Sequence, residues 1–146
     1  MLQKSSLTLS DGTKLDDLII RESNEVSLRV MSDKELYDIE MERVFAKTWL
    51  LLAHDTEIPN SGDFVVRDMA EDNVIIARDR EGNVNVSLNV CPHRGRRLID
   101  TPPGKRNAMG NRGSFACGYH GWTYGLDGAN THIPEVDDWQ GALCQG

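Results

Sequence analysis

Two short segments of the chain each place one cysteine close to one histidine. The first is Cys91-Pro92-His93 and the second is Cys117-Gly118-Tyr119-His120, with 23 residues between the two segments. Thiolate sulfur and imidazole nitrogen are both metal ligands, so two of each can complete the ligand set of a zinc ion or of an iron–sulfur cluster. A catalytic Cys–His pair would need only one residue of each type and would leave the other pair unexplained.

The mixed composition of each pair favours a cluster over zinc. Zinc sites usually pair like with like, with two cysteines in one loop and two histidines in another. If one iron of a binuclear cluster takes both cysteines and the other takes both histidines, each mixed loop must reach both irons, as in a Rieske [2Fe–2S] centre. The spacing therefore predicts four cluster ligands, with a zinc-stabilised interaction module as the alternative reading. These ligands are Cys91, His93, Cys117 and His120.

The residues around the predicted ligands resemble a known family. Residues 91–95 (CPHRG) and 117–122 (CGYHGW) are similar to the Rieske signature of aromatic ring-hydroxylating dioxygenases. Upstream, residues 40–49 and 62–64 resemble the N-terminal part of the large (α) subunit of those terminal oxygenases. The resemblance covers about residues 33–128 of the chain.

The resemblance implies a fold and a site. The fold is mostly β, of the Rieske iron–sulfur type, with small antiparallel sheets and an N-terminal α-helix. The site is a [2Fe–2S] cluster on the four ligands named above, lined by a second group of residues. That group comprises Arg94, Gly95, Tyr119, Gly121 and Trp122.

The resemblance also implies electron transfer. In the family, this domain accepts electrons from a ferredoxin or reductase and passes them to a mononuclear non-haem iron, which hydroxylates an aromatic ring with O₂. That iron needs two histidines and a carboxylate, so we expect it in a C-terminal domain absent from this chain. We therefore expect no catalytic residues and no oxygenase activity here. Family members commonly form homotrimers, with or without a small β subunit.

A free-standing Rieske ferredoxin is the runner-up. Residues 1–48, with their predicted arm and helix, argue against it, because such ferredoxins are smaller and begin close to their first strand.

Composition excludes several other classes. The 146 residues carry 16 Lys and Arg against 23 Asp and Glu, a net charge of −7, which argues against a nucleic-acid-binding surface. The longest apolar run, residues 49–53, is too short to span a membrane. No secretory signal is visible, and three cysteines do not build a disulfide framework. We therefore expect a cytoplasmic protein.

The N-terminal third is predicted to contain one helix. Residues 1–31 read as a polar arm that must dock on something to be ordered. Ser32 and Glu35 fit a capping box at the start of a packing helix over 32–48. Apolar residues at helical spacing form its expected buried face. They are Tyr37, Met41, Val44 and Phe45.

The remainder is predicted to be a Rieske domain over residues 49–135, followed at 136–146 by the start of a truncated C-terminal region. Strands are expected at 49–53, 64–67, 74–78 and 84–90, with turns at 58–62 and 79–83. The last strand alternates apolar and polar residues, which predicts one buried apolar face. The apolar residues are Val84, Val86, Leu88 and Val90.

Two loops, 91–97 and 117–122, are expected to bind the cluster; we call them the first and second cysteine loops. Against the family pattern that the sequence resembles, the linker over 98–114 is long, and we expect the insertion at 102–108. Extending a loop costs little free energy, so we expect the cluster to survive it.

Charge and polar neighbours suggest how the centre would behave. Residues 91–122 hold six basic residues and one acidic residue. This charge could steer an acidic electron donor; a solvated loop with no partner is the alternative reading. Trp122 stands where respiratory-chain Rieske proteins carry a serine that hydrogen-bonds a cluster sulfur. We therefore expect a reduction potential near the low end of the Rieske range, about −150 mV.

Three further residues receive no ligand role. We expect His54 to be buried and hydrogen-bonded, His132 to be a surface or packing residue, and Cys144 to be an ordinary thiol.

Overall fold

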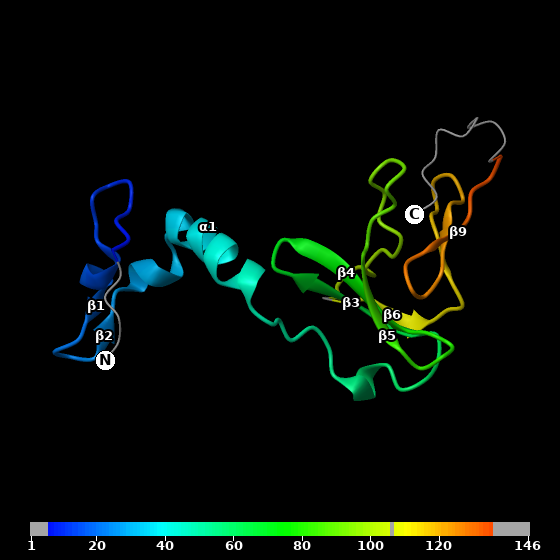
Figure 1. Ribbon diagram of the computed structural model, residues 1–146, viewed down its shortest axis with the longest axis horizontal. Coiled ribbons are helices and arrows are strands. Elements are labelled where there is room, and N and C mark those ends of the chain that lie inside the picture. Colours follow the sequence, from blue (N-terminus) through cyan, green and yellow to red (C-terminus); the bar gives the residue numbers. More distant parts are fainter. Residues whose placement is uncertain (1–5, 106, 136–146) are drawn as a thin grey trace. The chain divides into compact units, whose positions relative to one another are not determined.

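A computed structural model describes residues 6–105 and 107–135 of the chain (Figure 1). The chain divides into two compact units, Met1–Leu50 and Leu51–Gly146. In the described ranges, no helix has the length and apolar character needed to cross a membrane.

The first unit consists of short elements around one helix. They are η1 (Leu15–Leu18), β1 (Ile19–Ile20), β2 (Glu25–Val26), η2 (Leu28–Met31), α1 (Lys34–Arg43) and η3 (Phe45–Lys47). Strands β1 and β2 pair antiparallel. Leu9, Leu18 and Leu36 form a small buried cluster, so the segment predicted to be an arm packs against α1 of its own unit.

The start of α1 differs from the predicted capping box. Asp33, not Ser32, is the N-cap, and its carboxylate accepts hydrogen bonds from the backbone N–H groups of Glu35 and Leu36. The Glu35 carboxylate accepts instead from the backbone N–H and the hydroxyl of Ser10. The acidic side chain therefore ties the helix to the preceding segment rather than completing a local cap.

The expected buried face of the helix is wrong as well. Leu36 is the buried residue of α1, whereas Tyr37, Val44 and Phe45 are each exposed by 40% or more. The leucines that cover the helix meet it at Leu36, and regular α-helix ends at Arg43, before the last residues of the predicted stripe.

The second unit is built from antiparallel sheets, which confirms the mostly β fold. One sheet has the order β5-β4-β3-β6, from Val84–Leu88, Asp72–Arg78, Asp63–Met69 and Met109–Asn111. The other has the order β7-β8-β9, from Phe115–Ala116, Thr123–Tyr124 and Asn130–His132. A 3₁₀ turn, η4 (Asp55–Glu57), precedes β3. The predicted turns at 58–62 and 79–83 join these elements as expected.

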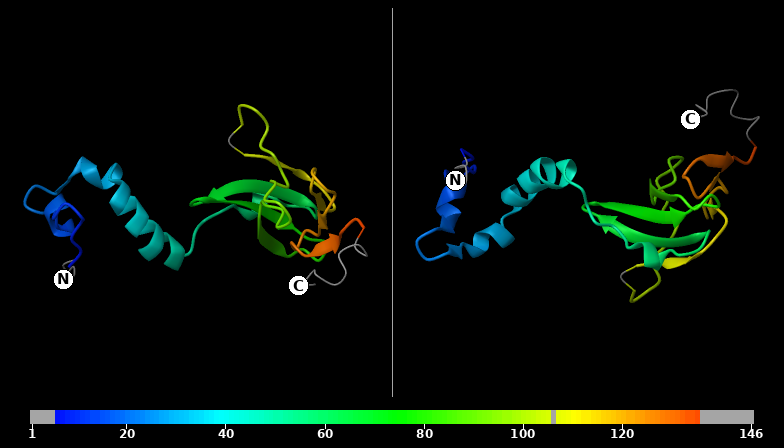
Figure 2. Two further views of the ribbon diagram at one scale, coloured as in Figure 1. Left: turned by 90° about the horizontal axis from the view of Figure 1, so that it is seen from above. Right: turned by 60° about the horizontal axis from the view of Figure 1, so that its bottom comes forward.

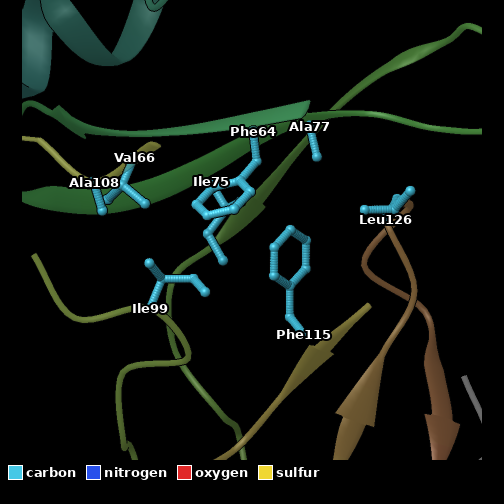
Figure 3. Packing of buried hydrophobic residues seen from close by; sticks show 8 residues of the cluster. All are labelled: Phe64, Val66, Ile75, Ala77, Ile99, Ala108, Phe115 and Leu126. Atoms are coloured by element: carbon cyan, nitrogen blue, oxygen red, sulfur yellow. The ribbon is translucent and has the colours of Figure 1, made fainter. Parts of the chain in front are cut away.

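One hydrophobic cluster connects the two sheets (Figure 3). Phe64 and Ile75 come from the large sheet, while Phe115 of β7 and Leu126, just after β8, approach from the small one. The rings of Phe64 and Phe115 meet edge to face, with centroids 5.5 Å apart. Apolar burial of this kind is the main term that stabilises a fold, and here it fixes the β7–β8 hairpin against the large sheet.

Residues 49–53 do not form the predicted strand. Leu52 and Ala53 pack instead with Ile58 on the opposite face of the large sheet, over Val65 and Val74. Only the last two residues of the run cover the sheet, because Trp49 and Leu51 are exposed by 90% or more.

Strand β5 lies in the predicted place, but its apolar face is not buried. The side chains of Val84, Val86 and Leu88 are about half exposed, whereas the polar residues between them are partly buried. Val86 pairs with Ile76, so its side chain lies on the face of the sheet where Leu52 and Ala53 pack. Those two residues cover β3 and β4 but do not reach β5, which is the edge strand, so the apolar side chains of β5 stay partly exposed.

Candidate metal centre

The two cysteine loops lie side by side at one end of the second unit (Figure 1). The first cysteine loop follows β5, and the second joins β7 to β8. The described part of the 98–114 linker extends away from the second cysteine loop (Figure 2). Its surface therefore lies away from that loop.

The first cysteine loop is closed by its own backbone. The N–H of Cys91 donates to the carbonyl of Arg96 at 2.8 Å, and the N–H of Gly95 donates back to the carbonyl of Cys91 at 2.9 Å. Gly95 has a φ of +71°, in the left-handed region where only glycine is free of strain. The glycine of the CPHRG segment is thus required by the turn.

The second cysteine loop repeats this pattern. Here the N–H of Cys117 donates to the carbonyl of Trp122 at 2.8 Å, and the N–H of Gly121 donates to the carbonyl of Cys117 at 3.0 Å. Gly121 has a φ of +75°. Two loops of different sequence therefore present their cysteines in the same backbone setting.

Both cysteines of these loops lie inside the protein as free thiols. Cys91 is 1% exposed and Cys117 is 4% exposed, and their side chains interact. Burial alone would raise the pKa of the Cys117 thiol, but the backbone N–H groups of Tyr119 and His120 outweigh it, so the pKa is lowered. These N–H groups favour the thiolate, which is the metal-binding form.

The two histidines lie together nearer the surface. The ring centroids of His93 and His120 are 4.5 Å apart, with His93 half-buried and His120 exposed. Burial lowers the pKa of His93, and the nearby His120 and Arg94 side chains lower it further. A lowered pKa favours the neutral imidazole, the form that binds a metal.

Aromatic side chains flank both histidines. The Trp122 indole is 8% exposed and stacks on the His93 ring, with centroids 4.8 Å apart and planes 10° apart. The Tyr119 ring has its centroid 3.8 Å from that of His120 and is 59% exposed. Trp122 therefore shields the interior of the site, whereas Tyr119 lines its outer edge.

Sequence reasoning missed one residue of the site. The hydroxyl of Tyr124 lies 3.2 Å from Cys91 Sγ, and its ring is buried with both cysteines. Burial raises the pKa of Tyr124, and the Cys91 side chain raises it further. The available signal was its place two residues after Trp122, in the short strand β8, because residues two apart on an extended chain point the same way.

The basic residues of the first cysteine loop are exposed. Arg94, Arg96 and Arg97 all reach solvent, and Arg96 forms an ion pair with Asp100 at 2.6 Å. The structure thus places positive charge on the loop that carries His93, with Arg94 close enough to lower the pKa of His93.

The remaining histidines lie elsewhere. His54 is exposed, contrary to the expected burial, and its ring caps η4 by accepting from the N–H of Thr56. His132 is exposed on β9, as expected. Cys144 lies outside the described residues.

The donor set fits a binuclear cluster. Two thiols pair inside and two imidazoles pair outside, so each metal of a two-iron centre would meet two protein ligands of one type. Within residues 6–105 and 107–135, no three His, Cys, Asp or Glu side chains gather as the ligands of one metal ion.

Known proteins share this sequence and fold. The chain is 38% identical over 117 residues to the biphenyl dioxygenase subunit alpha of Metapseudomonas furukawaii, covering 80% of this chain and 24% of that subunit. The naphthalene 1,2-dioxygenase of Rhodococcus sp., solved with bound indole, superposes with a TM-score of 0.70 at 40% identity, covering 81% of this chain and 26% of that one. A quaternary ammonium Rieske monooxygenase superposes with a TM-score of 0.70 at 27% identity, covering 80% and 30%.

This chain thus spans about a quarter of the length of the curated relatives it matches. The model of the Rieske [2Fe-2S] domain matches residues 48–141. The resemblance seen in the sequence is confirmed: the chain belongs to the Rieske [2Fe-2S] domain family, in the form found in the N-terminal portion of aromatic ring-hydroxylating dioxygenase α subunits.

Proposed function

We propose that Cys91 and Cys117 hold one iron of a [2Fe–2S] cluster and that His93 and His120 hold the other. The observation that carries this proposal is the two-by-two pairing, with interacting thiols in the interior and adjacent imidazoles nearer solvent. Such a cluster supplies one-electron chemistry, with a potential set by hydrogen bonds to its sulfurs and by solvent exposure.

The protein's own residues would shape that electron transfer. Trp122 excludes water from the buried side of the site and holds the His93 ring by stacking. The exposed His120 ring offers the short path between the site and solvent that a redox partner needs. The exposed arginines of the first cysteine loop would favour approach of an acidic electron donor.

We further propose that the chain is the electron-transfer part of a terminal oxygenase. A ferredoxin or reductase would supply the electrons, and a mononuclear iron in the remainder of the full-length protein would receive them. A homotrimer, with or without a small β subunit, is the assembly we propose. The matched relatives support this reading, because they are oxygenase subunits about four times the length covered here.

We propose an aromatic hydrocarbon as the substrate class. Relatives named for biphenyl and benzene are 37–38% identical to this chain. A quaternary amine is the second candidate, favoured by the monooxygenase at 27% identity. The full-length enzyme, supplied with reductase and O₂ and offered biphenyl, naphthalene and carnitine, is expected to oxygenate an arene; oxidation of carnitine alone would reverse the order of the candidates.

Cofactor content tests the cluster itself. Anaerobic reconstitution with iron and sulfide is expected to give equal amounts of iron and acid-labile sulfide, and a visible absorption that bleaches on reduction. Four variants, C91S, H93A, C117S and H120A, are each expected to lose the cluster, whereas H132A, which changes an exposed histidine on β9, should keep it. Stoichiometric zinc without iron would support the interaction-module reading, and a complete, active electron carrier ending near this point would support the free-standing ferredoxin.

A further inference from the structure

Asn89 lies where β5 ends and the first cysteine loop begins. It is 2% exposed, although it is a polar residue two positions before Cys91. Its carboxamide nitrogen donates to the Ile99 carbonyl at 2.8 Å and to Asn73 Oδ1 at 2.7 Å. Its oxygen accepts from the N–H groups of Leu98 at 3.1 Å and Ile99 at 2.9 Å. The side chain thus uses both donors and both acceptor sites of an amide.

These bonds connect the two ends of the first cysteine loop. Asn89 precedes the loop, and Leu98 and Ile99 follow it. The backbone N–H of Asn89 also donates to the Asn73 carbonyl at 2.8 Å, which holds this point to strand β4. One side chain therefore fixes the entry and the exit of the loop to each other and to the large sheet.

The second cysteine loop is held differently. Its two ends belong to paired strands, because Phe115 pairs with Tyr124 and Ala116 pairs with Thr123. Among the described residues, no strand pairing brackets the first cysteine loop: β5 stops at Leu88, and residues 98–99 are not in a strand. The carboxamide of Asn89 performs for the first loop what the β7–β8 pairing performs for the second.

The exit of the loop leads directly to both hydrophobic clusters near the site. Ile99 is buried with Phe115 in the cluster that joins the sheets, and Leu98 packs against the cluster that contains both cysteines. Moving residues 98–99 would therefore shift the loop relative to the second cysteine loop, where Cys117 and His120 lie.

We propose that Asn89 is a positioning residue: its carboxamide sets the place of Cys91 and His93 relative to Cys117 and His120. This inference rests on the proposed cluster. This role explains why a polar residue is buried just after the end of β5: at that point the buried side of the chain holds the first cysteine loop instead of packing in a hydrophobic core.

The test compares Asn89→Ala and Asn89→Asp with Asn85→Ala. Aspartate keeps the oxygen that accepts from Leu98 and Ile99 but has no donor for the Ile99 carbonyl. Asn85 lies on the same strand and donates to Asp79 in the hairpin at the other end of β5. Replacing it removes an amide hydrogen bond of the same kind without touching the loop.

The first readout is hydrogen exchange of the chain before iron is added. Asn89→Ala is expected to speed exchange of the Leu98 and Ile99 amides by roughly tenfold or more, relative to the β3–β4 amides. Asn89→Asp should fall between wild type and Asn89→Ala, and Asn85→Ala should leave both amides as in wild type. Unchanged exchange in both Asn89 variants would overturn the inference.

The second readout is the loaded chain. Asn89→Ala and Asn89→Asp are expected to change the g-values of the reduced cluster and to speed its loss, whereas Asn85→Ala lowers the unfolding midpoint with a wild-type spectrum. If Asn89→Ala does not fold, Asn89→Asp carries both readouts. An Asn89→Asp spectrum identical to wild type would show that Asn89 does not affect the geometry of the cluster, and would overturn the inference. A wild-type chain that binds no cluster would contradict the proposed function instead. Amide exchange would still test whether Asn89 holds residues 98–99 in place.

Discussion

The hydroxyl of Tyr124 lies 3.2 Å from the sulfur of Cys91, in the buried part of the site. A ligating thiolate has no proton, so this hydrogen bond must then run from the hydroxyl to the sulfur. Such a bond stabilises negative charge and therefore favours the reduced state.

Tyr124→Phe is expected to lower the reduction potential and leave the cluster bound. A bond worth about 1 kcal/mol corresponds to roughly 40 mV for a one-electron couple. Protein-film voltammetry measures the shift. Tyr119→Phe is the matched control, because it removes an exposed hydroxyl beside His120 and keeps the ring. Equal shifts in the two variants would show that the Tyr124 bond has no special effect.

Gly95→Ala tests the backbone requirement of the first cysteine loop. No atom lies within 4 Å of a Cβ added there, so the change introduces the strain of a φ of +71° and little else. The expected loss is about 1–2 kcal/mol of folding free energy, measured by denaturant unfolding.

Gly121→Ala extends this test to the second cysteine loop. It should cost more than Gly95→Ala, because its new Cβ would also meet Pro134 Cγ at 3.2 Å. Wild-type stability in both variants would contradict the assigned turn conformation.

Asp79 makes stability depend on pH at the β4–β5 hairpin. Burial alone would raise the pKa of this carboxyl, but hydrogen bonds from Asn83 and Asn85 outweigh it and hold the pKa below its ordinary value of 3.8. A lowered folded-state pKa gives stability that is present above 3.8 and is lost as pH falls through the folded value. Asp79→Asn should therefore be less stable than wild type at neutral pH, with a difference that shrinks below pH 3.8.

Thermal unfolding across this pH range provides the measurement. Asp127→Asn serves as the comparison, because Asp127 is an exposed acid whose carboxylate accepts the local N–H of Ala129 as its one hydrogen bond within the described part of the chain. A stability difference between wild type and Asp79→Asn that stayed constant through the acidic range would refute the assigned role of the carboxylate.

The arginines of the first cysteine loop are expected to set the rate of electron entry. Replacing Arg96 and Arg97 with glutamine should slow reduction by a ferredoxin several-fold at low salt and flatten the salt dependence. Stopped-flow reduction at increasing ionic strength measures this. Arg80→Gln, in the turn between β4 and β5, is the charge-matched control. A rate insensitive to salt in the wild type would remove the docking role.

Local chemistry made the site readable from the sequence. Cys91, His93, Cys117 and His120 stand in two short loops whose glycines are required by the turns, so spacing identified them as candidate ligands. The pairing of the two cysteines and of the two histidines joins different loops and depends on how the sheets pack. The positions of β3 and β4 were also predicted, because both strands contain β-branched residues and turn residues precede β3 and follow β4. The turn that joins them at 70–71 was not predicted, since Ala70 and Glu71 are not typical turn residues.

Tertiary context decided what the sequence could not. The run at 49–53 reads as a strand because it is apolar, yet among the described residues its backbone pairs with no strand. Leu52 and Ala53 pack on the large sheet, while Trp49 and Leu51 remain exposed. The alternation in β5 gave the right strand and the wrong face, since an edge strand can extend beyond the cover of its neighbours. Asn89 and Tyr124 act through residues 10 and 33 positions away, so the contacts that give them their roles depend on the tertiary fold.

Pulsed EPR of the reduced, iron-loaded chain tests the central claim most directly. With ¹⁵N-labelled histidine, the reduced cluster should show hyperfine couplings from two imidazole nitrogens, one of which disappears in each of H93A and H120A if any cluster is retained. A cluster signal with no histidine nitrogen coupling, or a chain that takes up zinc and remains free of iron, would contradict the ligand set.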